Sequence, residues 1–135
     1  MAPAASPQRR QASRFDLRTL VWALCLAGAF LATHMPPPEK PAQMILNDKF
    51  LHFMGFCALG IVTVWRVVGP TSRISITVLA GWLAFLLVYA AFDETTQELV
   101  GRDSEFGDWL ADAIGAVVGM SICVMSVWFR RADTA

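Results

Sequence analysis

Charged residues and cysteines are both scarce in this sequence, and each shortage excludes a class of protein. Only 16% of the 135 residues are charged, whereas 56% are hydrophobic. A soluble domain of this length normally carries more charge, so the composition favours an integral membrane protein. The formal net charge is zero, which provides no bulk electrostatic attraction to nucleic acid. The lipid bilayer is therefore the partner that the composition predicts.

The three cysteines, Cys25, Cys57 and Cys123, all fall within apolar stretches. They form neither a CxxC motif nor a zinc-binding spacing. We expect them to be small buried residues rather than ligands or redox partners. The sequence assigns no metal site and requires no cofactor, and the identity of any cofactor is unknown at this stage.

The hydrophobic residues are concentrated in four runs, each about long enough to cross a bilayer as an α-helix. We expect an all-α membrane protein, a bundle of four transmembrane helices at about residues 17–34, 50–69, 74–93 and 108–129. Asn47 or Asp48 is the expected N-cap of the second helix. Residues 1–14 and 132–135 are polar tails that cannot form a core.

The first apolar run has two interpretations. Arg14 and Arg18 flank its start, and Ala27–Gly28–Ala29 is similar to a signal-peptide cleavage site. The run nevertheless continues through 30–32, which makes it long enough to be a retained membrane span. Whether this span is cleaved stays open.

Basic residues near the helix ends predict the orientation in the membrane, because Lys and Arg are enriched on the cytoplasmic side. With both termini inside, eight basic residues are cytoplasmic and three are outside. The inside set is Arg9, Arg10, Arg14, Arg18, Arg66, Arg73, Arg130 and Arg131, and the outside set is Lys40, Lys49 and Arg102. We therefore expect both termini in the cytoplasm and loops 34–49 and 93–108 outside it.

The acidic residues have the opposite distribution. Nine of the eleven lie in the outer loops or at the outer helix ends, namely Glu39, Asp48, Asp93, Glu94, Glu98, Asp103, Glu105, Asp108 and Asp112. Acidic residues contribute little to topology. Their concentration indicates either a site at the outer face or simply well-solvated loops.

At the start of the second helix, Asp48 and His52 are four residues apart, so they share a helix face and the carboxylate can hold the imidazole. A histidine at this depth is expected to face the bundle rather than lipid. Gly55 is expected to allow another helix to approach closely. A histidine that only fixes helix packing is the alternative interpretation.

Two further segments bring polar residues to the same level. At the end of the third helix, Asp93 is expected to pair with Gln97, and Glu94 shares a side with Gln97. At the start of the fourth helix, Asp108 and Asp112 lie on one face.

Asp112 is one turn inside the membrane and needs a partner or a proton. The cations available on its side are Arg102, Lys49 and His52. Gly115 and Gly119 form a GxxxG motif, which is typical of tight helix contacts.

Together, these residues resemble the VanZ-like family of small bacterial membrane proteins. The resemblance rests on Asp48-Lys49-x-x-His52, Asp93-Glu94-x-x-Gln97, Arg102 and Asp108-x-x-x-Asp112-x-x-Gly115-x-x-x-Gly119. It covers about residues 17–129 and implies a VanZ-like four-helix domain over 15–131 in the bacterial cytoplasmic membrane. That family often has Asn where this chain has Asp112, which favours a structural or hydrogen-bonding role there and makes Asp108 the better candidate for chemistry.

The resemblance implies little about biochemistry. The founding member of the family is associated with resistance to the glycopeptide teicoplanin, but one chain gives no basis for a resistance role here. We expect a polar pocket at the extracytoplasmic face that binds or influences an envelope component, such as an envelope lipid or a peptidoglycan precursor. The alternatives are a membrane enzyme that acts on a lipid-linked or phospholipid substrate and an ion-linked transporter.

Each candidate residue then has an expected role. In an enzyme, His52 would be the general base, Asp48 its support and Glu94 a second acid or base. Binding residues would be Lys49, Gln97, Arg102, Asp108 and Asp112, with helix packing assigned to Gly55, Gly115 and Gly119. A metal-dependent variant would use His52, Glu94 and Asp108, although no spacing here is diagnostic of a metal. The sequence does not identify the substrate or the oligomeric state.

Overall fold

The computed structural model describes residues 16–35, 44–68 and 75–132, without the side chains of 44–47 and 131. The described parts are helical and contain no strand. The elements are α1 (Leu17–Thr33), α2 (Met44–Val67), α3 (Ile76–Gln97), the short 3-10 helix η2 (Glu98–Val100) and α4 (Phe106–Ala132). Our expectations for the tail 1–14 and for most of the tail 132–135 lie outside the described residues, as does the 36–43 part of the expected loop 34–49.

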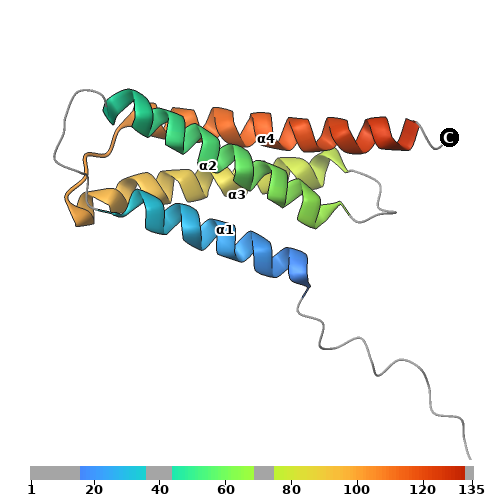
Figure 1. Cartoon of the computed structure of the whole chain (residues 1–135), viewed down its shortest axis with the longest axis horizontal. Helices are drawn as coiled ribbons and strands as arrows, with labels where there is room; N and C mark the ends of the chain where they lie inside the picture. The colour runs from blue at the N-terminus through green and yellow to red at the C-terminus, as the bar shows by residue number, and fades with distance from the viewer. Residues whose placement is uncertain (1–15, 36–43, 69–74, 133–135) are drawn as a thin grey trace, which may run out of the picture.

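The four α-helices run alternately up and down along one bundle (Figure 1). α1 and α3 finish at one end, where α2 and α4 begin. The described chain starts and finishes at the opposite end (Figure 1). This alternation is the arrangement that short connections between neighbouring helices favour, and it places the polar helix ends together.

Several helix boundaries differ from the sequence prediction, and the two largest differences lie at the end where α2 and α4 begin. α2 begins at Met44 rather than near 50, so Asp48 is inside the helix and neither it nor Asn47 is the N-cap. α3 continues past 93 to Gln97, and α4 begins at Phe106 rather than 108. At the end of α3, Glu94 and Gln97 are buried and hydrogen-bonded, which extends the helix over residues that hydropathy alone assigns to a loop.

Glycines bring α2 and α4 into the most extensive helix–helix contact of the described chain. A Cβ on Gly115 or Gly119 would collide with the backbone of α2 at Phe53 and Cys57. From the other side, a Cβ on Gly60 would lie 2.6 Å from the Ala116 carbonyl oxygen. The expected role of the GxxxG motif in close helix packing therefore fits the structure.

The expectation for Gly55 was wrong. A Cβ there would meet nothing within 4 Å, so no helix approaches this position. The periodicity was misleading because Gly55 lies three residues from His52, on the edge of the helix face rather than at its centre. Gly60 takes the packing role instead.

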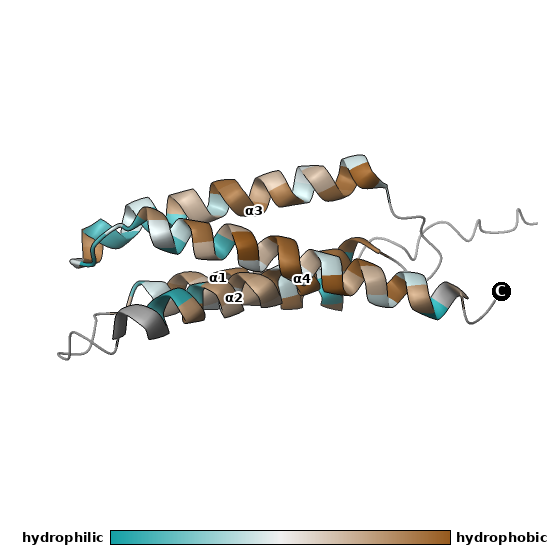
Figure 2. Ribbon diagram, turned by 90° about the horizontal axis from the view of Figure 1, so that it is seen from above, coloured by the Kyte–Doolittle hydropathy of each residue, from teal (hydrophilic) through white to brown (hydrophobic). Residues whose placement is uncertain are grey.

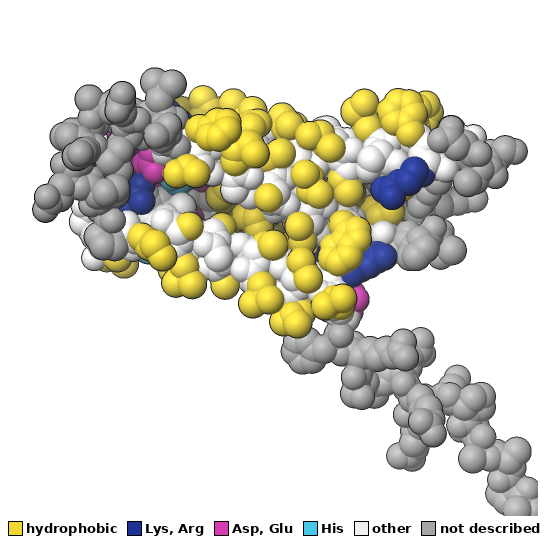
Figure 3. Space-filling view, viewed as in Figure 1, with side chains coloured by type: hydrophobic (Ala, Val, Ile, Leu, Met, Phe, Trp, Pro, Cys, Tyr) yellow, Lys and Arg dark blue, Asp and Glu magenta, His cyan; other side chains and the backbone are white. Residues whose placement is uncertain are grey.

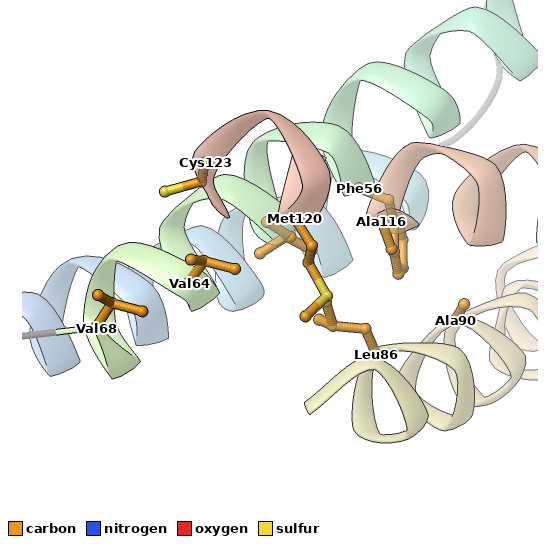
Figure 4. Close-up of a cluster of buried hydrophobic side chains, with 9 residues drawn as sticks. Phe56, Val64, Val68, Leu86, Ala90, Ala116, Met120 and Cys123 are labelled. Carbon is orange, nitrogen blue, oxygen red and sulfur yellow. The ribbon is translucent and has the colours of Figure 1, made fainter. Parts of the chain in front are cut away.

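The apolar core fills the space between α2, α3 and α4 (Figure 4). Leu86 and Ala90 from α3 are fully buried, and Leu86 points toward Met120 of α4. α1 contributes no fully buried residue. It is attached at its edge by hydrogen bonds, such as Tyr89 Oη to the Leu26 carbonyl at 2.7 Å.

Between the two ends the helices are mostly hydrophobic (Figure 2), and hydrophobic side chains are widespread on the face seen in Figure 3. Three helical segments are long and apolar enough to cross a membrane: Asp48–Val67, Ile76–Val100 and Phe106–Arg130. α1 is shorter, with 17 residues, or about 25 Å at roughly 1.5 Å per residue. The prediction of four helices is confirmed, with three clear candidate spans. A fourth span at α1 stays a prediction.

A candidate polar site at one end of the bundle

Hydrophilic segments gather at the end where α2 and α4 begin (Figure 2), and hydrogen bonds join polar side chains from all four helices there. Six of them are nearly inaccessible: His52, Asp93, Glu94, Gln97, Asp108 and Asp112 are each exposed by 4% or less. Burying such groups costs free energy unless they are hydrogen-bonded or paired. We call the following set the polar cluster: Thr33, His34, Asp48, Lys49, His52, Asp93, Glu94, Gln97, Arg102, Glu105, Asp108 and Asp112.

A deeply buried histidine–aspartate pair joins α2 to α4 within the polar cluster. His52 Nδ1 donates to Asp112 Oδ1 at 3.0 Å. The partner of His52 is therefore Asp112, whereas the spacing on α2 suggested Asp48. The close packing at Gly115 explains the difference, because it brings the first turns of α4 directly against His52. Asp112 has the hydrogen-bonding role that we expected.

Two atoms of this pair have no hydrogen-bond partner among the described residues. They are His52 Nε2 and Asp112 Oδ2, both buried. A buried nitrogen and a buried oxygen without partners are unusual in a folded protein, because each loses its hydration without compensation. These two atoms mark the place where an additional group would be stabilised.

The end of α3 forms a second hydrogen-bonded group. Gln97 Nε2 donates to Asp93 Oδ2 and to Glu94 Oε2, each at 3.3 Å. The backbone N–H of Glu105 donates to Glu94 Oε1, which ties the loop before α4 to α3. The expected pairing of Asp93 with Gln97 is therefore present. The backbone reverses at Gly101, whose φ of 78° is readily adopted only by glycine.

α1 contributes residues that the sequence did not single out. Thr33 Oγ1 donates to Asp93 Oδ1 at 3.0 Å, and His34 Nε2 lies 3.0 Å from Thr96 Oγ1. His34 also stacks on Phe30, with ring centroids 3.8 Å apart. The sequence did contain a signal for these two residues. Thr33 and His34 lie at the outer end of the first apolar run, which places them level with Asp93 in an alternating bundle.

The basic residues Lys49 and Arg102 are each paired with carboxylates. Arg102 Nη2 donates to both oxygens of Asp48 at 2.8 Å. Lys49 Nζ lies 2.7 Å from both Glu105 Oε2 and Asp108 Oδ1. Glu105, like Thr33 and His34, had not been assigned a role from the sequence. These pairs balance part of the negative charge but leave the polar cluster with more acidic than basic groups.

Next to the polar cluster, α3, the loop and α4 line an open hollow of about 380 Å³. Its lining is mostly apolar, with Glu94 at the wall that it shares with the polar cluster. The other lining residues are Ala91, Thr95, Ser104, Phe106 and Trp109. A space with apolar walls and one acidic corner suits an amphipathic ligand.

The opposite end of the bundle also carries charge, but in a different form. Arg66 lies over the rings of Trp22 and Trp82, 4.9 Å from each centroid. Arg18 Nη1 donates to the carbonyls of Trp65 and Val68, each at 3.1 Å. We call this arrangement of Arg18 and Arg66 with tryptophans the arginine end.

The fold and these contacts define a class: a small helical membrane protein with apolar spans and a buried polar cluster at one end. Comparison with known proteins then gives the family. The sequence model of the VanZ/LLP1 family matches residues 6–129. The chain therefore belongs to the VanZ/LLP1 family, as the sequence motifs predicted. No curated protein and no solved structure matches it significantly.

Proposed function

We propose that the polar cluster and the adjacent hollow bind an amphipathic component of the bacterial cell envelope at the extracytoplasmic face. The class of ligand is a phospholipid or a lipid-linked precursor. The observation that carries this proposal is Glu94, which lines the hollow and is also hydrogen-bonded within the polar cluster. One ligand in this space would contact apolar and ionic groups together.

The chemistry of the hollow and of the polar cluster supports this ligand class. Phe106 and Trp109 supply an apolar wall for an acyl or polyprenyl chain. Arg102 uses only Nη2 for Asp48 among the described residues, so its other guanidinium donors remain for a phosphate oxygen. An arginine fixed by a carboxylate on one side is well suited to bind phosphate on the other.

Filling the hollow tests the proposal. The protein is reconstituted in nanodiscs with a photoactivatable phosphatidylglycerol or a photoactivatable polyprenyl phosphate, and crosslinked peptides are mapped. Crosslinks should concentrate in residues 91–109, and Ser104→Trp should reduce them several-fold. Ser121→Trp, on an exposed part of α4, is the matched control and should change nothing. An even distribution of crosslinks along all four helices would contradict the proposal.

The extracytoplasmic location is the second part of the proposal and has a separate test. It rests on the excess of basic residues at the end opposite the polar cluster. An alkaline phosphatase fused after Arg131 should be inactive, since this reporter works only outside the cytoplasm. Activity of that fusion would place the polar cluster on the cytoplasmic side.

The His52–Asp112 pair favours membrane enzyme chemistry as the second candidate function. An imidazole whose Nδ1 donates to a carboxylate and whose Nε2 is unpaired has the arrangement of a general base. His52→Ala, Glu94→Ala and Arg102→Ala distinguish the two functions. Variants that fold and still bind the lipid probe but no longer convert it, by mass spectrometry, would favour the enzyme. Loss of folding in all three would make the polar cluster structural.

A further inference from the structure

His52, whose Nε2 has no hydrogen-bond partner among the described residues, belongs to a group of side chains that together resemble a metal-binding set. One ligand atom from each of Asp48, His52 and Asp108 can be chosen so that all three lie within 4.8 Å of one another. Tetrahedral ligands about 2.1 Å from a zinc ion are roughly 3.4 Å apart. Side-chain rotations that move these atoms by about an ångström would therefore complete the coordination geometry.

Acidic clusters are common without a metal, but here the histidine adds independent evidence. His52 is 3% exposed, and its Nε2 has no hydrogen-bond partner among the described residues. Its Nδ1 is already used by Asp112. A histidine that binds a metal typically donates its other ring N–H to a carboxylate, which fixes the tautomer and directs the lone pair toward the ion. Asp112 provides this second interaction.

The surrounding charges also fit a cation. Arg102 is hydrogen-bonded to Asp48, as the carboxylate ligands of metal sites usually are to a neighbouring group. Lys49 contacts Glu105 as well as Asp108, so it keeps a partner when Asp108 turns toward the ion. Asp93, Glu94 and Asp112 add further buried carboxyl groups, which carry negative charge when they are ionised. A divalent cation would compensate for it in a low-dielectric environment.

We infer that Asp48, His52 and Asp108 bind one divalent transition-metal ion of the zinc or manganese class, with Asp112 as the positioning residue. Mixed nitrogen and carboxylate ligands suit both metals. The sequence assigned no metal, and its metal-dependent variant included Glu94, which instead binds Gln97 and the Glu105 backbone. Three protein ligands leave a coordination position open. A phosphate oxygen of the ligand proposed above would bind there, so the inference deepens that function.

Metal titration of the purified full chain tests the inference without any added lipid. The protein is prepared free of a polyhistidine tag, treated with a chelator and titrated with Zn²⁺ or Mn²⁺ alone by calorimetry. One equivalent should bind to the wild type. His52→Ala and Asp108→Asn should each weaken binding at least tenfold. Glu98→Gln is the matched control because Glu98 is an exposed carboxylate outside the polar cluster, and it should bind like the wild type.

The role of Asp112 has its own readout. Asp112→Asn should weaken metal binding by about 10- to 100-fold, the usual effect of changing a second-shell partner, without changing the stoichiometry. If His52→Ala does not fold, pulsed electron paramagnetic resonance of the Mn²⁺-loaded wild type should still detect one histidine nitrogen.

A folded wild type that binds no metal, or binding that His52→Ala leaves unchanged, would overturn the inference. Absence of the nitrogen coupling in the Mn²⁺-loaded wild type would overturn it as well. Failure of the lipid crosslinking test with normal metal binding would instead reject the proposed function alone.

Discussion

The two ends of the bundle both contain charged side chains, but they stabilise them differently. At the arginine end, Arg18 and Arg66 lie on tryptophan rings and bond to backbone carbonyls or to Thr19. Among the described residues, neither has a carboxylate partner. At the other end, buried carboxylates and a histidine from four helices interact with one another.

This difference distinguishes an end that suits membrane anchoring, the arginine end, from an end that suits a binding site, the polar cluster. Arginine and tryptophan at a helix end are favourable at a membrane interface, where the charged group reaches water and the ring lies at the headgroup level. Buried carboxylates without enough cations serve no such purpose and are costly near the membrane. At the polar cluster, a bound group would therefore offset the free-energy cost of burying the carboxylates. The arginine end is explained by the membrane alone.

Disrupting the contact between α2 and α4, the helices that connect both ends, should have the largest effect on the free energy of unfolding. Gly119→Ala would place a Cβ against the Cys57 carbonyl, and overpacking of this kind costs about 3 kcal/mol. Gly55→Ala is the control, since nothing lies within 4 Å, and it should be neutral or stabilising by up to about 1 kcal/mol. Reversible unfolding in mixed micelles measures both. Equal effects would show that the α2–α4 contact is not tight.

Removing Asp112 from the buried His52–Asp112 pair should have the next largest effect on the free energy of unfolding. Asp112→Ala leaves His52 Nδ1 buried without an acceptor, which costs about 2 kcal/mol. Asp112→Asn keeps an oxygen acceptor at the same place and should cost less than about 1 kcal/mol. The same unfolding measurement applies. Equal stability of the alanine variant and the wild type would mean that the pair does not contribute to the fold.

A change at the arginine end should have the smallest effect and should leave the site intact. Arg66→Lys loses the planar stacking on two tryptophans and the hydrogen bond from Nε to Thr19. The expected cost is about 1 kcal/mol. Metal titration and lipid crosslinking should match the wild type. A change in either would show that the two ends are coupled and would weaken the distinction between them.

Much of the fold could be predicted because its signals are local. Apolar runs between polar segments fix the helices and their number, and alternation then brings 48–52, 93–97 and 108–112 to one end. The family followed from the same spacing. Helix ends were less predictable. The last turn of α3, for example, continues past Asp93, where Glu94 accepts a hydrogen bond from the Glu105 backbone in the loop before α4.

The partners within the site could not be predicted for the same reason. Helical spacing made Asp48 the natural partner of His52, yet Asp48 binds Arg102 and His52 binds Asp112. Which of two carboxylates reaches an imidazole depends on the rotation and approach of α4. The contributions of Thr33 and His34 depend likewise on where α1 docks.

By itself, the sequence determined the class, the helices, the family and the end at which the polar residues gather, because hydropathy and spacing act along the chain. The tertiary structure alone decided which atoms of the polar cluster are paired and which are not. The small residues Gly60, Gly115 and Gly119 let α2 and α4 approach closely enough to join His52 to Asp112. Among the residues that the structure describes, His52 Nε2 has no hydrogen-bond partner, and this atom supports the inference of a bound cation.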